Sequence, residues 1–133
     1  MATIKGIYKH DLINVLTHCK SKTEITVDAS SNDTSYSPVD MLCAALGSCM
    51  MSMMSVTAKN HDFSIDGATY EIEKVMADSP KRVGQINVTI NFNQQYTEKQ
   101  QALLRNAANT CPVKNSINKD IIVNVKMNYE VKS

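Results

Sequence analysis

Residues 37–60, with the sequence SPVDMLCAALGSCMMSMMSVTAKN, form the most informative segment of the chain. Ser37 is a favoured helix N-cap, Pro38 suits the first helical position, and Asp40 stands where a capping-box acid returns a hydrogen bond. Apolar residues then recur at helical spacing, at Leu42, Leu46, Cys49, Met53 and Val56. The segment therefore predicts one long helix with Cys49 on its apolar stripe.

No charged residue occurs between Met41 and Ala58, so a membrane span has to be compared with a buried helix. A span needs roughly 17 to 25 predominantly apolar residues, and this segment only just reaches that length. Serines, a threonine and a glycine make it mildly apolar, and amphipathic strand patterns surround it. We expect a helix enclosed by protein on most sides and no membrane partner.

Strand patterns lie on both sides of this helix. Residues 4–9, 12–18 and 23–28 are rich in β-branched side chains and are separated by polar turns, which predicts three short strands. After the helix, residues 68–76 and 85–93 predict a hairpin around the turn DSPKRVG. In the second hairpin strand, alternate positions are apolar and should share one face, namely Ile86, Val88, Ile90 and Phe92.

The last third of the chain contains two helix starts and a strand. Thr97 and Gln100 predict a helix that ends near Asn109, and a second helix begins at Cys111 and Pro112. Residues 121–131 alternate as a final strand. This order predicts an α+β fold, with helices packed against antiparallel sheet, in a single domain over residues 1–133.

The composition excludes several classes of partner. Hydrophobic residues make up 43% and charged residues 20% of the chain, the net charge is +1, and Trp is absent. No basic run with interleaved aromatic residues occurs, so we expect no nucleic-acid partner. The N-terminus lacks the apolar core of a signal peptide, which favours a cytoplasmic location and reduced cysteines.

The cysteines show no metal-binding spacing. They form no CxxC pair, and the three histidines show no zinc-type spacing with them, so we expect no metal. Cys19 and Cys43 are interpreted as structural. Cys49 should be buried, which disfavours its thiolate, whereas the N–H groups at a helix start should favour a thiolate at Cys111. A lone buried cysteine is more often core filler than catalyst.

The combination of Cys49 and Cys111 allows a further interpretation. In a two-cysteine peroxidase, one thiolate attacks the O–O bond and becomes a sulfenic acid, and a second thiol condenses with it to a disulfide. Two cysteines can be bridged when their Cα atoms lie within roughly 4.4 to 6.8 Å of each other. The sequence permits this arrangement without showing it.

The segments SPVDMLCAALGSCMMSMM and CPVKNSI, on either side of a strand hairpin, resemble the two cysteine motifs of the OsmC/Ohr family. These proteins are small thiol-dependent peroxidases that act on organic hydroperoxides. The resemblance implies that Cys49 attacks the peroxide, that Cys111 resolves it and that no cofactor is needed. It also implies an intertwined homodimer, with antiparallel sheets packed around long central helices and the uncharged helix covered by a partner chain.

The sequence departs from the Ohr branch at two positions, which places it in an outlying OsmC-like branch. That branch has a glutamate directly after the motif proline, where this chain has Val39, with Asp40 one residue further on. Its arginine lies in the N-terminal strands, where this chain has none. Asp40 could replace the carboxylate or only cap the helix, and Lys9 or His10 could replace the cation.

The sequence analysis therefore predicts a cytoplasmic, cysteine-based peroxidase that reduces organic hydroperoxides, and hydrogen peroxide less well, with an external dithiol as reductant. The alternative is an OsmC-like protein with little turnover that binds small molecules or senses redox state under stress. The methionine cluster is expected to pack the helix or a dimer contact, with a substrate pocket as the minor alternative; it comprises Met50, Met51, Met53 and Met54.

Overall fold

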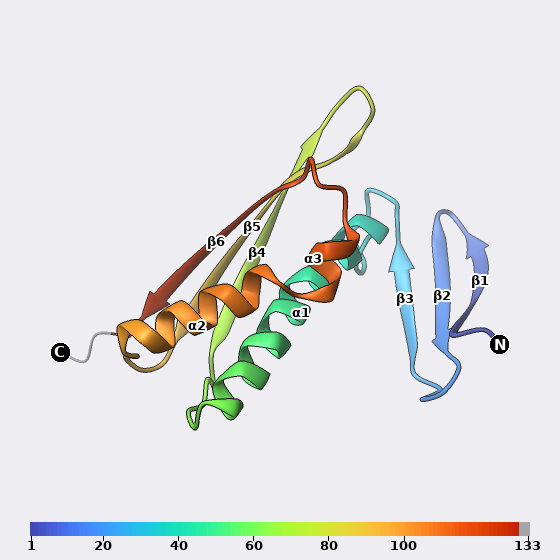
Figure 1. Cartoon of the computed structure of the whole chain (residues 1–133). Coiled ribbons are helices and arrows are strands. Elements are labelled where there is room, and N and C mark those ends of the chain that lie inside the picture. The colour runs from blue at the N-terminus through green and yellow to red at the C-terminus, as the bar shows by residue number, and fades with distance from the viewer. Residues whose placement is uncertain (131–133) are drawn as a thin grey trace. The chain divides into compact units, whose positions relative to one another are not determined.

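A computed structural model describes residues 1–130, which form two compact units, Met1–Leu42 and a second unit that begins at Cys43. The elements follow one another in the predicted order, and the α+β class is confirmed (Figure 1). The prediction of a single domain over residues 1–133 stays a prediction. The elements are β1 (Ile4–His10), β2 (Ile13–His18), β3 (Glu24–Asp28), α1 (Pro38–Asn60), β4 (Thr69–Ala77), β5 (Arg82–Phe92), α2 (Glu98–Asn109), α3 (Pro112–Ser116) and β6 (Ile122–Tyr129).

The N-terminal unit contains an antiparallel sheet in the order β1-β2-β3. The turn between β1 and β2 consists of Asp11 and Leu12, whose φ angles are 50° and 67°. Two successive positive φ angles are typical of the two-residue hairpin turn whose twist matches that of the strands. This turn pairs His10 with Ile13 and so fixes the end of β1.

Asp28 anchors the polar loop that follows β3. Its side chain is buried, and its carboxylate accepts hydrogen bonds from the hydroxyl and N–H groups of Ser30, at 2.5 and 2.8 Å, and of Thr34, at 2.5 and 3.1 Å. These bonds, first the Ser30 hydroxyl and then the Thr34 hydroxyl, hold the pKa of Asp28 far below its usual range. The loop between β3 and α1 is therefore ordered by one carboxylate.

Helix α1 begins with the predicted capping box. The Ser37 N–H donates to Asp40 Oδ2 at 3.0 Å, and the Asp40 N–H donates to Ser37 Oγ at 3.0 Å. Pro38 occupies the first helical position, where a missing N–H costs nothing. The local sequence thus fixes where α1 starts.

The sheet of the C-terminal unit has the order β4-β5-β6. Strands β4 and β5 form the predicted antiparallel hairpin, but β6 runs parallel to β5. The sheet is therefore mixed rather than wholly antiparallel, which corrects that part of the prediction. Helices α2 and α3 form the crossover connection that a parallel pair of strands requires. Val131, which was predicted to lie in the final strand, falls outside the described residues.

The two faces of this sheet differ as the alternation in β5 predicts. The predicted apolar face is buried, with exposed fractions between 0% and 3%, at Ile86, Val88, Ile90 and Phe92. On the opposite face, Asn87 accepts from Asn124 at 3.0 Å, and Asn91 accepts from Asn128 at 2.9 Å. Paired amides therefore line the polar side of the β5–β6 pair.

Helix α1 packs against β4 through a glycine. A Cβ atom at Gly47 would lie 2.4 Å from Ile72 Cδ1, so any larger residue here would require the Ile72 side chain to shift. The buried side of α1 runs along Cys43, Leu46, Gly47, Met50, Met54 and Ala58. Leu46 belongs to the predicted apolar stripe, but Leu42 and Val56 are exposed. The predicted stripe therefore lies beside the side of the helix that is buried in this chain.

Helix α1 has the length and apolar composition of a membrane span, with a mean hydropathy of 1.6, and no other helix in residues 1–130 does. One such helix is weak evidence, because core helices of soluble proteins meet the same criteria. Met50 and Met54 are fully buried against the protein, which agrees with their predicted packing role.

Candidate active site

Cys111 lies between α2 and α3 and caps the second of these helices. Its backbone is extended, Pro112 is the first helical residue, and its Sγ atom accepts the Lys114 N–H at 3.3 Å. The predicted helix start is confirmed. The proline and the cap together fix the direction of the Cys111 side chain.

The thiol of Cys111 is fully buried, and burial is the largest cause that raises its pKa. The N–H groups of Lys114 and Val113 lower the pKa, as expected at a helix start, but they do not outweigh burial and the neighbouring Cys49 side chain. The expectation that the helix start favours a thiolate at Cys111 is therefore wrong in its net direction. At neutral pH, Cys111 is a neutral thiol.

Cys49 lies in the middle of α1 and is half-buried. The prediction that it is buried is wrong, because the buried side of the helix passes through Gly47 and Met50 and leaves Cys49 beside it. A half-buried residue is more open to a dissolved reactant than a residue of the core is.

The structure brings Cys49 and Cys111 together. The side chain of Cys49 is close enough to contribute to the raised pKa of Cys111, and both residues belong to the C-terminal unit. Neither cysteine forms a disulfide. Two free thiols from elements far apart in the chain therefore share one site. Cys111 is buried and neutral, and Cys49 is half-buried.

The other two cysteines have different surroundings. Cys43 is buried in α1, where it packs with the other apolar residues of the helix. Cys19 is half-buried just after β2 in the N-terminal unit, and its N–H donates to Thr3 O at 2.9 Å. Nothing in these positions contradicts the structural role that the sequence predicted for both.

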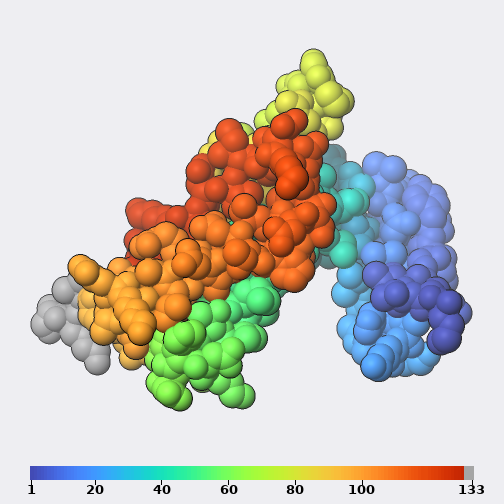
Figure 2. Space-filling model, viewed as in Figure 1, coloured from blue at the N-terminus to red at the C-terminus, as the bar shows by residue number. Residues whose placement is uncertain are grey.

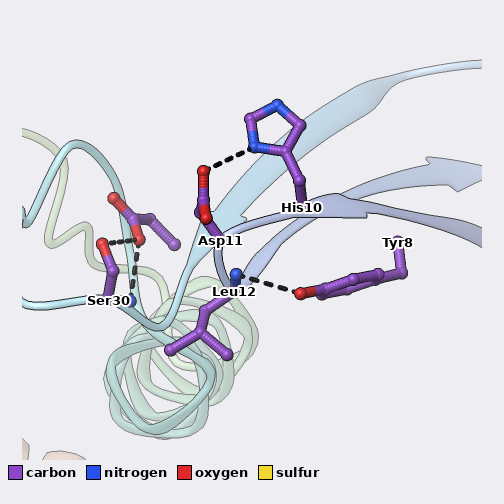
Figure 3. A network of polar contacts seen from close by, with 6 residues as sticks. Tyr8, His10, Asp11, Leu12 and Ser30 are labelled. Atoms are coloured by element: carbon purple, nitrogen blue, oxygen red, sulfur yellow. Dashed lines mark hydrogen bonds and ion pairs between the residues drawn. The ribbon is translucent and has the colours of Figure 1, made fainter.

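The predicted tuning residues belong to the N-terminal unit. His10 is exposed, and its Nδ1 atom lies 3.0 Å from Asp11 Oδ2 at the turn after β1 (Figure 3). Lys9 is also exposed on β1. Asp40 acts as the capping acid of α1. Any influence of these three residues on Cys49 stays a prediction.

A cleft between α2 and β6 was not predicted from the sequence. It has a volume of about 490 Å³, and Gln101, Arg105 and Asn109 lie on its helical side. Alternate residues of β6 line its other side, namely Val123, Val125, Met127 and Tyr129. The helical spacing on α2 and the alternation on β6 are both visible in the sequence, but only the pairing of β6 with β5 places them together.

Comparison with known proteins identifies the fold. The sequence model of a family described as OsmC-like protein matches residues 30–126. The chain belongs to the OsmC-like family. The match includes both Cys49 and Cys111, the two positions on which the sequence resemblance was based. No curated protein matches the chain.

Solved structures support membership of the OsmC-like family. A crystal structure from Psychrobacter arcticus 273-4, provisionally named an osmotic stress induced and detoxification response protein, is 37% identical, has a TM-score of 0.91 and matches over 96% of each chain. The organic hydroperoxide resistance protein OhrB of Bacillus subtilis is 17% identical, with a TM-score of 0.71 over 96% of this chain and 97% of its own. An organic hydroperoxide resistance protein from Elizabethkingia anophelis is 14% identical, with a TM-score of 0.73 over 98% of each chain.

The more distant of these structures establish the shared fold. Both of these proteins are named for resistance to organic hydroperoxides. The predicted OsmC-like architecture is thereby confirmed.

Proposed function

We propose that this protein is a cysteine-based peroxidase that reduces organic hydroperoxides, with Cys49 as the attacking residue and Cys111 as the resolving residue. The observation that carries the proposal is the pair of unlike thiols. Cys49 is half-buried and can meet a peroxide, and the buried Cys111 remains a thiol beside it at neutral pH. A resolving residue has to be a nearby thiol that does not itself react first.

The reaction has three balanced steps. The Cys49 thiolate attacks one oxygen of ROOH, the O–O bond breaks, and the products are a Cys49 sulfenic acid and an alkoxide that takes up a proton to become ROH. The Cys111 thiol then attacks the Cys49 sulfur, an S–S bond forms, and water leaves. An external dithiol reduces the disulfide and is itself oxidised to a disulfide. None of the steps requires a metal or organic cofactor.

Asp40 and the cations of β1 are the proposed tuning groups. The resemblance to the family assigns a carboxylate and a cation near the attacking cysteine, and Asp40, Lys9 and His10 are the residues nearest to those motif positions in the sequence. A lysine or histidine would hold a thiolate less rigidly than the planar guanidinium of an arginine. We therefore expect slower peroxide reduction than an arginine would give.

The proposal is tested by counting free thiols before and after one equivalent of cumene hydroperoxide. The wild type should lose two thiols rapidly, Cys111→Ser one, and Cys49→Ser none. Cys19→Ser is the control, because Cys19 lies in the N-terminal unit, and it should behave like the wild type. If Cys49→Ser loses thiols as fast as the wild type, the assignment of Cys49 is wrong.

A second candidate function is a stress protein that binds a small molecule or senses redox state with little turnover. The observation that favours it is the position of the two arginines, Arg82 at the start of β5 and Arg105 on α2, because neither lies in the N-terminal strands. A sensor would form the disulfide once but would not consume peroxide continuously with excess dithiol. Steady-state consumption therefore distinguishes the two functions.

We also propose that the protein acts as a homodimer in the cytoplasm. Several apolar side chains of the N-terminal sheet are more than half exposed in the single chain, namely Ile4, Ile7 and Tyr8. On α1, Val56 is 52% exposed. Exposed apolar surface of this kind is typical of a protein interface, and the resemblance to the family assigns it to a second copy of the chain.

A further inference from the structure

The cleft between α2 and β6 combines one positive charge, several uncharged polar groups and a row of apolar side chains along β6. In Figure 2 the surfaces of α2, in orange, and β6, in red, adjoin each other. The β6 side of the cleft presents Val123, Val125 and Met127, and the α2 side presents the guanidinium of Arg105. A volume of about 490 Å³ falls within the range of about 300–1,000 Å³ that small-molecule sites occupy.

Arg105 is the charged residue that lines this cleft. Within residues 1–130 the Arg105 guanidinium makes no ion pair and no hydrogen bond. The chain's other arginine differs, because Arg82 donates to the carbonyl oxygens of Asp78, at 2.8 Å, and Pro80, at 2.9 Å. A planar guanidinium whose donors have no partner among the described residues suits a carboxylate, which it can bind through two parallel hydrogen bonds.

Tyr129 lines the cleft near the C-terminal end of β6, where it interacts electrostatically with Arg105. Burial raises the pKa of the Tyr129 phenol, while the Arg105 guanidinium lowers it, so the positive field of Arg105 reaches this end of β6. The Tyr129 ring is held in place by stacking on Phe92, with ring centres 5.2 Å apart. The polar end of a ligand would therefore lie between α2 and a fixed aromatic ring.

The remaining polar groups of the cleft carry no charge. Gln101 lies one helical turn before Arg105, and Asn109 lies one turn after it. Their amides can donate to an oxygen but cannot neutralise a second negative charge. Asn124 of β6 also lines the cleft, and its amide donates to Asn87. The lining therefore matches a ligand that has one negatively charged group and an apolar chain, with the chain lying along Val125 and Val123.

We propose that the cleft between α2 and β6 binds a monocarboxylate with a linear alkyl chain, with the carboxylate at Arg105 and the chain along β6. The site is separate from Cys49 and Cys111, neither of which lines it. Its occupation does not depend on the peroxide chemistry proposed above, and no covalent step is involved.

Sodium decanoate is the probe, added below its micelle concentration to the fully reduced, full-length protein. Binding is followed by the ¹³C-methyl NMR shifts of Val123, Val125 and Met127. We expect saturable shifts at these methyl groups and an affinity about tenfold lower in Arg105→Gln, because the variant loses one charge-assisted contact. Arg105 is exposed, so this substitution leaves the fold intact.

One control variant and two control ligands separate the contribution of the carboxylate charge from that of the alkyl chain. Arg82→Gln removes the other arginine and should bind decanoate like the wild type. Decanol, which has the chain without the charge, should bind the wild type and Arg105→Gln equally, and butyrate, which has the charge without the chain, should bind neither measurably. The proposal is overturned if decanoate binds Arg105→Gln as tightly as the wild type or shifts other methyl groups instead. It is also overturned if the β6 methyl groups contact a second copy of the chain and decanoate does not perturb them.

Discussion

The two sulfur atoms of the site differ because their local surroundings differ. Cys111 is placed by a local signal, a helix cap followed by a proline, so its position could be predicted from the sequence. The exposure of Cys49 could not be predicted, because α1 carries no charge between Met41 and Ala58 that would mark its exposed side. Periodicity identifies a buried side only when another side is polar.

The raised pKa of Cys111 leads to a prediction about its titration. Burial is the main cause and Cys49 adds to it, so the thiol should lose its proton only above its ordinary pKa of 9.0. Cys49→Ser removes the neighbouring sulfur and should move the Cys111 titration to lower pH. The measurement is the ¹³Cβ shift of labelled cysteine as a function of pH. An unchanged midpoint in Cys49→Ser would show that the two thiols do not interact.

Asp28 leads to a prediction about stability at acid pH. Its pKa is lowered in the folded chain, so its stabilisation is present above the ordinary value of 3.8 and is lost as the pH falls below it. Asp28→Asn should therefore lower the free energy of unfolding at neutral pH, and the difference from wild type should shrink between about pH 5 and pH 2. Urea unfolding across this range measures it. Asp33→Asn, at an exposed position in the same loop, should show no such convergence.

At the scale of elements, local patterns predicted most of the fold. Capping boxes at Ser37 and Thr97 mark the starts of α1 and α2, and alternation marks the buried face of β5. The direction of β6 was missed, because the choice between parallel and antiparallel pairing depends on where the crossover returns the chain. The α2–β6 cleft was missed for the same reason.

The contact between α1 and β4 leads to a prediction about coupled substitutions. Gly47→Ala places a Cβ atom 2.4 Å from Ile72 Cδ1 and 3.3 Å from Tyr70 Cε2. Alanine favours the helix by about 1 kcal/mol, but the overlap costs about 1–3 kcal/mol, so the variant should be about 1 kcal/mol less stable.

A double-mutant cycle isolates this overlap. Ile72→Val removes Cδ1, so Gly47→Ala should be less harmful in that background, by about 1 kcal/mol in the free energy of urea unfolding. Additive effects would mean that Ile72 moves aside freely and that Gly47 does not set the approach of α1 to the sheet. Gly47 lies two residues before Cys49, so the same contact fixes the part of α1 that carries the attacking sulfur.

At the scale of the whole molecule, the single chain leaves apolar surface exposed in both of its units. Ile7 and Tyr8 are 62% and 60% exposed in the N-terminal sheet, and Val56 is exposed on α1. The resemblance to the family implies that another chain covers the uncharged helix, and the exposure of Val56 fits that expectation. A chain of 14.7 kDa that exposes this much apolar surface should associate in solution.

The proposed homodimer is tested at α1. Val56→Lys places a charge on the exposed apolar side of the helix, where a second copy would have to bury it, and burying an unpaired charge costs several kcal/mol. Light scattering after gel filtration should give twice the chain mass for the wild type and the mass of one chain for Val56→Lys. Lys59→Glu, an exposed position in the last turn of α1, is the control and should stay dimeric. If Val56→Lys folds and keeps the wild-type mass, α1 does not form the contact between copies, and the exposed N-terminal sheet becomes the surface to test next.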